Sequence, residues 1–346
     1  MIFIHSPIRV AMLLRVERRK ADSVMKKLRS LRLVDTRRRV VRDGHWVGIP
    51  VKSPPPEGLG ELVDGDGRQR TEQVPPYERI LDAADVPASL KPLLPDKWEL
   101  LGNVLVLKLP GKLLAYKAEL ARAYGSVLRA KSVLLDTSGS RGVLREPTTE
   151  LLSGTDTEAV HLENGIRYSL DAARLMFSSG NMAERIRMGK VVRPGEKVAD
   201  LFAGIGYFAL PMAVHGRADT VWACELNPTA FRYLARNVRL NKVAGRVVTL
   251  EGDCRAVAPE GVADRVVMGH FDSPDFIPKA LKVLKPEGGI IHLHVLCPKK
   301  GIPGAALGPA LEAIHERGHD ARLHECVRVK SFKPGTWHIV LDITVS

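Results

Sequence analysis

The sequence lacks the features that mark membrane, secreted and zinc-dependent proteins. No apolar run approaches the roughly 18 residues needed to cross a bilayer, and no small-residue cleavage site follows the short apolar patch before Arg9. The four cysteines are isolated and form no C-x-x-C pair of the kind used for zinc or redox chemistry. We therefore expect a cytoplasmic protein that keeps its thiols reduced, most of them in the core.

Patterns that would hold a metal ion are also sparse. His292 and His294 share one face of a predicted strand, and His315 and His319 lie four residues apart at the end of a predicted helix. The strand pair lacks a third ligand close in sequence. The helix pair lies among charged residues, as is typical of a solvated helix face. We expect no metal site.

Positive charge is abundant and concentrated in one segment. The 346 residues carry a net charge of +13, with 45% hydrophobic and 26% charged residues, which is ordinary for a globular protein apart from the sign of the charge. Between Arg15 and Arg42 there are twelve Lys or Arg residues and three acids. Because clustered cations gain affinity by releasing counterions from phosphates, this segment predicts an RNA partner.

Changes in composition and periodicity divide the chain into four parts. Residues 1–50 read as a small basic α+β module, and residues 51–76, rich in Pro and Gly, read as an extended linker. Residues 77–170 read as a mixed α+β middle domain that ends in a hairpin folded at Asn164-Gly165. Residues 171–346 alternate strands and helices and close with a hairpin.

The stretch from Val198 to Glu225 is typical of a nucleoside-binding site. A short apolar run leads into Gly204-x-Gly206 and then into a helical pattern, as where the first strand of a parallel sheet meets its crossover helix. A tight turn needs such glycines even when nothing binds, so the pattern is weak alone. A second apolar run ends in Glu225, 19 residues after Gly206, where an acid can accept hydrogen bonds from both ribose hydroxyls.

Two further observations favour a nucleoside without a pyrophosphate. The loop lacks the third glycine that a dinucleotide usually requires. A third predicted strand ends in Asp253-Cys254, where a carboxylate and a backbone N–H could hold an adenine edge. With Asp200 in the first strand, this layout resembles S-adenosylmethionine-dependent transferases. We expect an α/β, class I methyltransferase-like (Rossmann-type) fold, mostly parallel, with one antiparallel strand in its C-terminal hairpin.

Three motifs together resemble one family of tRNA-modifying enzymes. They are Phe-Ser-Ser-Gly-Asn-Met-Ala-Glu-Arg at 177–185, Asp-Leu-Phe-Ala-Gly-Ile-Gly-Tyr-Phe at 200–208, and Ala-Cys-Glu-Leu-Asn-Pro at 223–228. One branch of this family comprises the guanosine-37 N1-methyltransferases and the other the wybutosine-pathway aminocarboxypropyltransferases. The basic N-terminal module is similar to the tRNA-elbow-binding domain of archaeal members.

The segment after the fourth predicted strand distinguishes the branches. Methyltransferases of the family usually carry Asn-Leu-Pro there, whereas residues 267–272 read Val-Met-Gly-His-Phe-Asp. The resemblance therefore implies transfer of the 3-amino-3-carboxypropyl group of S-adenosylmethionine to C7 of 4-demethylwyosine at position 37 of tRNA(Phe), with release of methylthioadenosine. Two alternatives stay open: guanosine-37 N1-methylation on the same fold, and a non-catalytic tRNA-binding protein.

The resemblance also implies which residues would contact the cofactor. It gives Ser178, Arg185, Glu225, Asp253 and Cys254, the last through its backbone, and the layout of the glycine loop and first strand adds Asp200, Gly204 and Gly206. Arg185 would hold the α-carboxylate of the methionine arm in a charge-assisted pair, with a hydrogen bond from Ser178.

Four residues are candidates on the acceptor side. Glu184 and His270 are the candidate proton acceptors, each with a simpler structural role as the alternative. Tyr207 and Phe271 are candidates to stack on the unpaired base in the anticodon loop. The basic module would contact tRNA phosphates away from that base.

Overall fold

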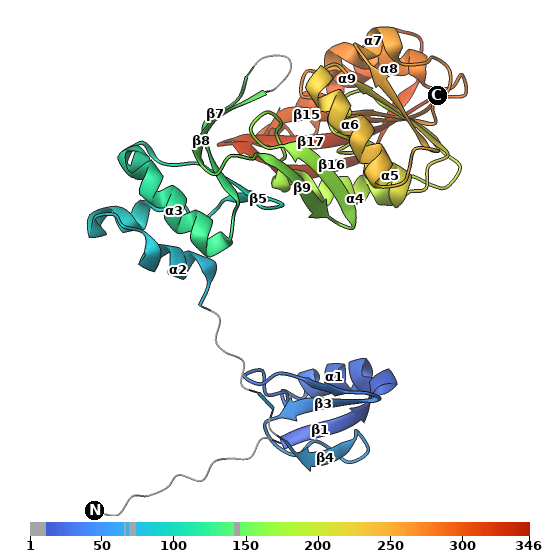
Figure 1. Ribbon diagram of the computed structural model, residues 1–346. Helices are drawn as coiled ribbons and strands as arrows, with labels where there is room; N and C mark the ends of the chain where they lie inside the picture. Colours follow the sequence, from blue (N-terminus) through green and yellow to red (C-terminus); the bar gives the residue numbers. More distant parts are fainter. Residues whose placement is uncertain (1–11, 66, 69–73, 142–145) are drawn as a thin grey trace, which may run out of the picture. The chain divides into compact units, whose positions relative to one another are not determined.

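The computed structural model describes residues 12–65, 67–68, 74–141 and 146–346, and it divides the chain into two compact units, Met1–Glu78 and Arg79–Ser346 (Figure 1). Residues 8–11, expected to begin the first strand, lie outside the described residues. In the part of the chain that the structure describes, no helix combines the length and the apolarity that crossing a membrane would need.

The N-terminal unit is a four-stranded sheet covered by one helix. Its strands have the order β2-β3-β1-β4, with β1 at Met12–Glu17, β2 at Val41–Asp43, β3 at Trp46–Val51 and β4 at Glu61–Asp64. The helical part is η1 at Arg18–Lys20 followed by α1 at Ala21–Ser30. The expected turn at Asp43-Gly44 joins β2 to β3 with Gly44 at φ +53°. Leu14, Leu28 and Ile49 form the buried centre of this unit.

Part of the segment expected to be a linker is a strand of this sheet. β4 lies inside the 51–76 range and pairs antiparallel with β1, so that Leu14 faces Leu62. The prediction of an extended linker is therefore wrong for residues 61–64. The Pro and Gly composition concealed this strand because its four residues are too few to show a clear alternation.

The middle region has its own sheet and helices. The strand order is β5-β6-β7-β8, with β5 at Glu99–Leu101, β6 at Val104–Leu107, β7 at Ser132–Arg141 and β8 at Glu146–Ser153. Its helices are α2 at Pro76–Ala83, η2 at Ala88–Leu93, η3 at Gly111–Tyr116 and α3 at Lys117–Leu128. The apolar pattern of residues 98–109 by itself predicts a single strand, but the structure has a hairpin there, which turns at Gly102 with φ +58°.

A two-stranded hairpin follows, formed by β9 at Glu158–Glu163 and β10 at Ile166–Asp171. Its turn is at the expected Asn164-Gly165, both with positive φ. The Asn237 side chain on helix α6 accepts from the Ser169 N–H at 2.7 Å and donates to the Ser169 carbonyl at 3.1 Å. These bonds attach the hairpin to α6 (Pro228–Leu240) of the C-terminal region, whereas the expected boundary at residue 170 assigned it to the middle domain.

The C-terminal region, residues 171–346, is built on a seven-stranded sheet with the order β13-β12-β11-β14-β15-β17-β16. β17 is antiparallel to both of its neighbours and the other neighbouring pairs are parallel, which confirms the expected fold class. The strands are β11 at Lys197–Asp200, β12 at Thr220–Glu225, β13 at Val247–Glu251, β14 at Arg265–Met268, β15 at Gly289–Pro298, β16 at Ala321–Lys333 and β17 at Thr336–Val345.

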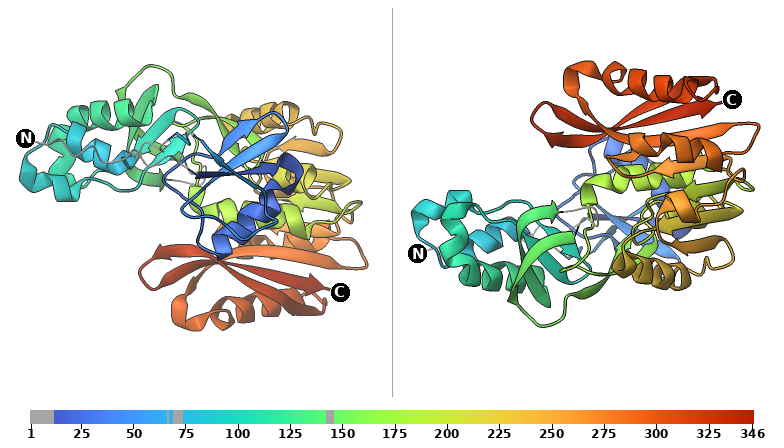
Figure 2. Two further views of the ribbon diagram at one scale, coloured as in Figure 1. Left: turned by 90° about the horizontal axis from the view of Figure 1, so that it is seen from below. Right: turned by 90° about the horizontal axis from the view of Figure 1, so that it is seen from above.

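Helices cover both faces of this sheet, as Figure 2 shows. One face packs against α4 at Met182–Val191, α5 at Ala209–Val214 and α6 at Pro228–Leu240, and the other packs against α8 at Ile277–Val283 and α9 at Gly304–His315. Short pieces complete the region: η4 at Ser179–Asn181, α7 at Cys254–Val257, η5 at Ser273–Phe276 and η6 at Lys299–Gly301. The carboxyl ends of the parallel strands therefore meet at one open edge.

Candidate active site

A cavity of about 300 Å³ lies at this edge. It is bounded by the loops after β11, β12, β13 and β14 and by the start of α4. Of the predicted cofactor residues, six line the cavity: Ser178, Arg185, Gly204, Glu225, Asp253 and Cys254. Asp200 and Gly206 are not among the lining residues.

The two glycines of the loop after β11 are required by the turn itself. Gly204 has φ +58°, and a Cβ there would lie 2.4 Å from the Tyr207 ring. Gly206 has φ +100°, and a Cβ there would lie 2.8 Å from Leu210 Cγ. Only Gly204 reaches the cavity, so Gly206 serves the packing of the turn against the following helix.

Glu225 connects two of the cavity loops. Its Oε2 accepts from the Gly204 N–H and its Oε1 from the Asn227 N–H, both at 2.7 Å. Burial raises the pKa of Glu225 despite these two hydrogen bonds. The side chain is only half-buried, and each carboxylate oxygen retains acceptor capacity for a ligand hydroxyl.

Asp253 and Cys254 form the third loop, at the start of α7. Asp253 accepts from the Arg255 N–H at 2.9 Å, and its hydrogen bonds with the Arg255 side chain lower the pKa of Asp253. Cys254 is buried, and burial raises the pKa of its thiol to about 12. A thiol with this pKa is not a thiolate at neutral pH, so any contact by Cys254 uses its backbone or its packing surface.

Asp200 lies behind the cavity at the end of β11. It is fully buried, and its Oδ1 accepts from the Phe202 N–H at 3.3 Å. Its Oδ2 has no hydrogen-bond partner among the described residues. Burial raises the pKa of Asp200 to about 7. Through its hydrogen bond with the Phe202 N–H, Asp200 supports the loop after β11 from behind the cavity.

The start of α4 forms a polar wall of the cavity. Arg185 donates to both oxygens of Glu163, at 2.6 and 2.7 Å, and its guanidinium lies 4.6 Å from the centre of the Phe177 ring. The sequence did not indicate Glu163 as its partner. Asn181, which was not among the predicted site residues, lines the same wall. Its Oδ1 is buried and has no hydrogen-bond partner in the described part of the chain.

His270 lines the opposite wall, after β14. Its ring stacks on Phe202 at 5.5 Å, and its Nδ1 accepts from the Asp272 N–H at 3.2 Å. A neutral histidine that accepts at Nδ1 carries its proton on Nε2. The Asp272 Oδ2 atom also lies 3.6 Å from Nδ1, so Asp272 approaches this nitrogen through both its backbone and its side chain.

The two aromatic residues expected to stack on a base, Tyr207 and Phe271, both contact other side chains or carbonyls of the protein. The Tyr207 hydroxyl donates to the Met176 carbonyl, and its ring packs edge-on against Phe177 at 5.6 Å. Phe271 does not line the cavity and packs against Phe332 and His338. Tyr207 therefore shapes the cavity wall, and Phe271 belongs to an aromatic group beside it.

Comparison with known proteins identifies the family. Residues 159–318 match the TRM5/TYW2 methyltransferase domain, and residues 77–157 match the TYW2 N-terminal domain. The chain is 42% identical over 277 residues to the tRNA(Phe) (4-demethylwyosine(37)-C(7)) aminocarboxypropyltransferase of Pyrococcus horikoshii, covering 80% of this chain and 99% of that protein. The chain belongs to the TRM5/TYW2 family. The resemblance drawn from the three motifs is confirmed.

Two more relatives represent the two branches of the TRM5/TYW2 family. A crystal structure of P. horikoshii TYW2 in complex with MeSAdo is 41% identical, with a TM-score of 0.70, and covers 78% of this chain and 98% of that one. The tRNA (guanine(37)-N(1))-methyltransferase Trm5b of Pyrococcus abyssi is 31% identical over 96% of this chain and 98% of that protein. An alignment of that extent includes most of the N-terminal unit.

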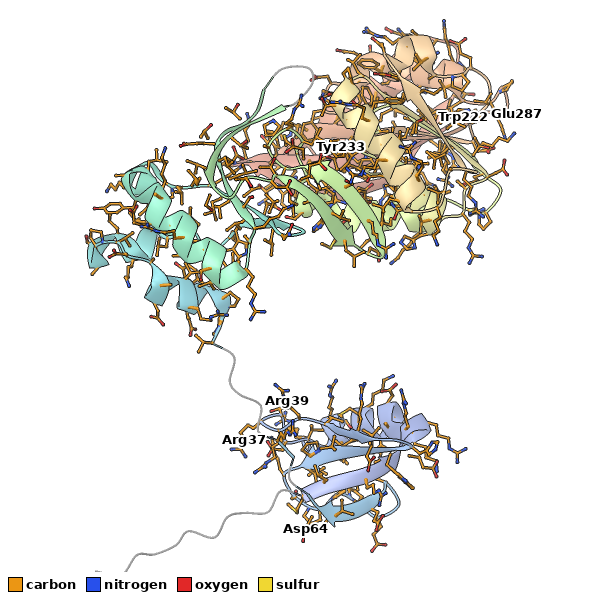
Figure 3. All side chains as sticks on the ribbon, viewed as in Figure 1. Arg37, Arg39, Asp64, Trp222, Tyr233 and Glu287 are labelled. Carbon is orange, nitrogen blue, oxygen red and sulfur yellow. The ribbon has the colours of Figure 1, made fainter. Side chains whose placement is uncertain are left out.

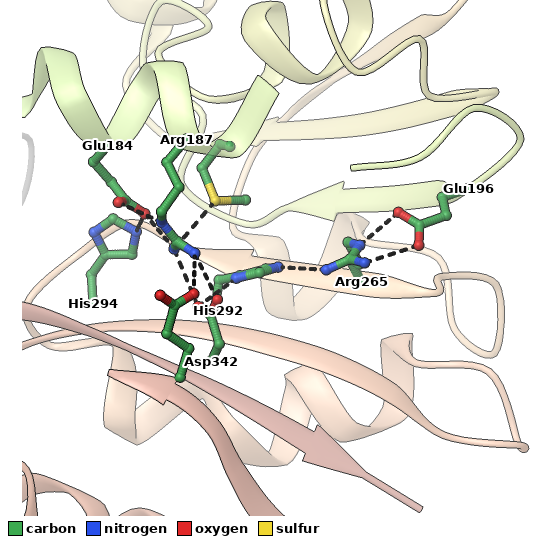
Figure 4. Close-up of polar contacts among 9 residues, drawn as sticks. Glu184, Arg187, Glu196, Arg265, His292, His294 and Asp342 are labelled. Carbon is green, nitrogen blue, oxygen red and sulfur yellow. Dashed lines mark hydrogen bonds and ion pairs between the residues drawn. The ribbon is translucent and has the colours of Figure 1, made fainter. Parts of the chain in front are cut away.

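In this TRM5/TYW2 chain, Glu184 lies in a buried ionic cluster and not among the residues lining the cavity (Figure 4). Arg187 donates to both Glu184 oxygens, at 2.7 and 2.8 Å, and also to Asp342 at 2.7 Å. Burial raises the pKa of Glu184. The structure therefore favours a role in holding α4 against β17 over contact with the reacting atoms.

The same cluster explains His292, one of the histidines considered as a metal ligand. Its Nδ1 lies 2.7 Å from Asp342, and its Nε2 lies 3.3 Å from a guanidinium nitrogen of Arg265. Because arginine can only donate, Nε2 accepts from Arg265 and Nδ1 donates to Asp342, so both ring nitrogens have partners within the cluster. Among the described residues there is no group of three or more His, Cys, Asp or Glu placed to hold a metal ion.

Proposed function

We propose that this chain transfers the 3-amino-3-carboxypropyl group of S-adenosylmethionine to C7 of 4-demethylwyosine at position 37 of tRNA(Phe), releasing methylthioadenosine. The observation that carries the proposal is the 42% identity to the Pyrococcus horikoshii protein of that name over 99% of its length. The absence of Asn-Leu-Pro after β14 supports this branch over N1-methylation. Action on tRNA would place the protein in the cytoplasm.

The cavity has the donor and acceptor set that S-adenosylmethionine requires. Glu225 retains acceptor capacity for the two ribose hydroxyls, and the Asp253-Cys254 loop faces the place for the adenine edge. The buried, partnerless Oδ1 of Asn181 would accept from the α-ammonium. When bound, the sulfonium compound supplies an electrophilic carbon, and the residues of this chain decide which carbon faces the acceptor.

The Arg185 side chain would orient the methionine arm. Glu163 accepts from Nε and Nη2 of its guanidinium, which fixes the side chain and leaves Nη1 directed at no acceptor among the described residues. That nitrogen would donate to the α-carboxylate in a charge-assisted bond, with Ser178 beside it. A guanidinium already held rigid loses less conformational entropy on binding.

On the acceptor side, His270 would contact the base from the cavity wall after β14. The contact from the Asp272 N–H to Nδ1 and the stacking on Phe202 hold the ring in that orientation. Glu184 would contribute by positioning α4, whose N-cap Asn181 and first-turn Arg185 would lie near the methionine arm.

The N-terminal unit would bind tRNA phosphates. Figure 3 shows Arg37 and Arg39 on its outside, and both side chains are exposed. Arg15 lies over the ring of the exposed Trp46 at 4.8 Å, which presents an aromatic surface beside positive charge. Such a combination is typical of nucleic-acid-binding surfaces.

Cofactor labelled at two positions tests the proposed reaction. Purified protein is incubated with tRNA carrying 4-demethylwyosine or unmodified guanosine at position 37, with label in either the methyl or the carboxyl carbon of S-adenosylmethionine. We expect carboxyl label in the modified tRNA together with released methylthioadenosine. Methyl label in guanosine-37 tRNA would support the methyltransferase alternative, and no label in either RNA would support the non-catalytic one.

Replacing Arg185 by lysine is expected to weaken binding of S-adenosylmethionine about tenfold and to leave binding of methylthioadenosine unchanged. Lysine keeps a positive charge next to Glu163 but lacks the planar guanidinium, whose several N–H donors can bind Glu163 and the ligand α-carboxylate at the same time. Methylthioadenosine lacks the amino-acid arm and is the internal reference. Titration calorimetry with both ligands measures the effect, with Arg193→Lys on the exposed loop after α4 as the control. Equal weakening of both ligands would show that Arg185 only supports the shape of the cavity.

Removing residues 1–75 is expected to weaken tRNA binding and to flatten its salt dependence. Each lost phosphate contact lowers the slope of log K against log[salt] by about 0.7–0.9. The cut precedes α2, so it removes β4 together with its partner strand β1. Binding is measured at several salt concentrations, and affinity for S-adenosylmethionine is the control that should stay constant. An unaltered slope would argue against phosphate contacts by this unit.

A further inference from the structure

The turn between β16 and β17 lies at the same edge of the sheet as the cavity. β15 is parallel to β14, and β17 is antiparallel to both β15 and β16. β16 therefore runs in the same direction as β14, and both strands end at the edge where the cavity lies. The turn at residues 334–335 extends from this edge.

This hairpin contacts the cavity wall directly. Lys330 of β16 donates to Ser178 Oγ at 2.6 Å, and Ser178 lines the cavity. The Lys330 side chain crosses closely over Gly180, where an added Cβ would lie 2.9 Å from Lys330 Cδ. The glycine of the Phe-Ser-Ser-Gly-Asn motif thus allows the hairpin to approach the start of α4.

An exposed aromatic side chain lies next to this contact. Phe332 is 48% exposed although it is a large apolar residue. The Phe332 ring packs against the Phe271 ring in a T-shaped arrangement, with the ring centres 5.3 Å apart and an angle of 76° between the ring planes. Phe271 directly follows His270 of the cavity wall. Phe332 is therefore held beside the cavity with much of its ring surface open to solvent.

Three exposed lysines lie in the two chain segments that meet at this edge. Lys333 ends β16, and Lys299 and Lys300 follow β15; all three are exposed. The Lys299 N–H donates to the Gly335 carbonyl at 2.9 Å, which joins the two segments. No acidic residue occurs between Glu287 and Glu312 in the first segment. The second segment likewise has none between Glu325 and Asp342.

We propose that this tip surface, formed by Lys299, Lys300, Phe332 and Lys333, binds unpaired RNA nucleotides next to the acceptor base. Phe332 stacks on a neighbouring base, and the lysines contact the flanking phosphates. An aromatic platform among cations tolerates any base sequence, because every base has a π-face. The acceptor is RNA only under the proposed function, on which this inference rests.

Four variants test the tip surface by equilibrium binding of tRNA. Phe332→Ala is expected to weaken binding about tenfold, and Phe332→Trp to bind like the unaltered protein. The triple change of Lys299, Lys300 and Lys333 to glutamine should weaken binding and reduce the salt slope. Leu162→Ala, at a 65% exposed position on β9, is the apolar control and should have no effect.

Lys282→Gln is the matched control for charge. Lys282 is exposed on α8, and its carbonyl accepts from the N–H of Gly261, which lies four residues before the start of β14, at the opposite edge of the sheet. Affinity for S-adenosylmethionine should stay constant in every variant, because the tip surface does not line the cavity. That measurement also verifies that the C-terminal region remains folded.

Unchanged tRNA binding by Phe332→Ala would overturn the proposal. Equal losses for the alanine and tryptophan variants would overturn it as well, because a stacking platform accepts either aromatic ring. The binding assay is independent of the labelling experiment. If the unaltered protein transfers no carboxyl label, the proposed reaction fails, whereas the tip surface fails only on the binding data.

Discussion

Replacing Glu225 by alanine is expected to lower the affinity for S-adenosylmethionine about 100-fold or more. A carboxylate that accepts from two ribose hydroxyls makes two charge-assisted hydrogen bonds, each worth about 1.5–3 kcal/mol. The same oxygens also accept from the Gly204 and Asn227 N–H groups at 2.7 Å, so their loss loosens two cavity loops. Titration calorimetry with S-adenosylmethionine and with adenosine measures the effect, and both ligands should weaken because both carry the ribose.

Glu251 provides the matched control for this change. It is an exposed carboxylate at the end of β13, directly opposite Glu225 in the parallel register. Glu251→Ala removes the same charge from the neighbouring strand end and should bind S-adenosylmethionine like the unaltered protein. If Glu225→Ala keeps its affinity while the chain remains folded by circular dichroism, the nucleoside is not bound at this strand end.

Replacing Asp342 by alanine is expected to lower the free energy of unfolding by about 3–5 kcal/mol, because the change removes one of the two carboxylates paired with Arg187 and leaves the buried His292 Nδ1 without its partner. The Asp342 side chain is 4% exposed and pairs with Arg187 at 2.7 Å. Glu325 offers a control on the same guanidinium, since it lies 3.7 Å from Arg187 but is 56% exposed. Glu325→Ala should cost about 1 kcal/mol or less. Equal effects in urea denaturation would show that burial of the pair is not what makes it strong.

The contribution of Asp342 should depend on pH in one direction. Burial acts to raise its pKa, but hydrogen bonds from His292 and Arg187 outweigh burial and hold the pKa well below its usual value. The stabilisation is therefore present above the unfolded-state pKa of about 3.9 and is lost as the pH falls through the lower folded-state value. The stability difference between the unaltered protein and Asp342→Ala should shrink below about pH 4. A difference that grows on acidification would contradict this assignment.

The positions of strands and turns in the C-terminal region could be predicted from local sequence. Apolar runs bounded by glycine located β11 and β12, and Glu225 at the end of β12 was expected at the cavity, where it lies. The Asn164-Gly165 turn followed equally from a local requirement for positive φ. These predictions are correct because strand periodicity and turn geometry depend on a few neighbouring residues.

The hydrogen-bond partners of the predicted site residues come from distant segments of the chain, so local sequence could not predict them. Arg185 was expected to be available for a ligand carboxylate, yet Glu163, 22 residues earlier, occupies two of its nitrogens. Glu184 was expected at the reacting atoms, yet it shares Arg187 with Asp342, which lies 155 residues after that arginine. The sequence of the motif at 177–185 does not specify which distant residues will bond to its side chains.

By itself the sequence determined the class of fold, the family and the strand ends around the cavity, because periodicity and turn chemistry are local. Only the tertiary structure decided that β4 joins the N-terminal sheet and that Gly180 makes room for Lys330. It also decided that Phe332 stands exposed beside the cavity. The physical reason is that tertiary packing decides which strands meet at one edge of the sheet, and this decides which side chains become partners. Local sequence patterns do not encode which distant segments will meet.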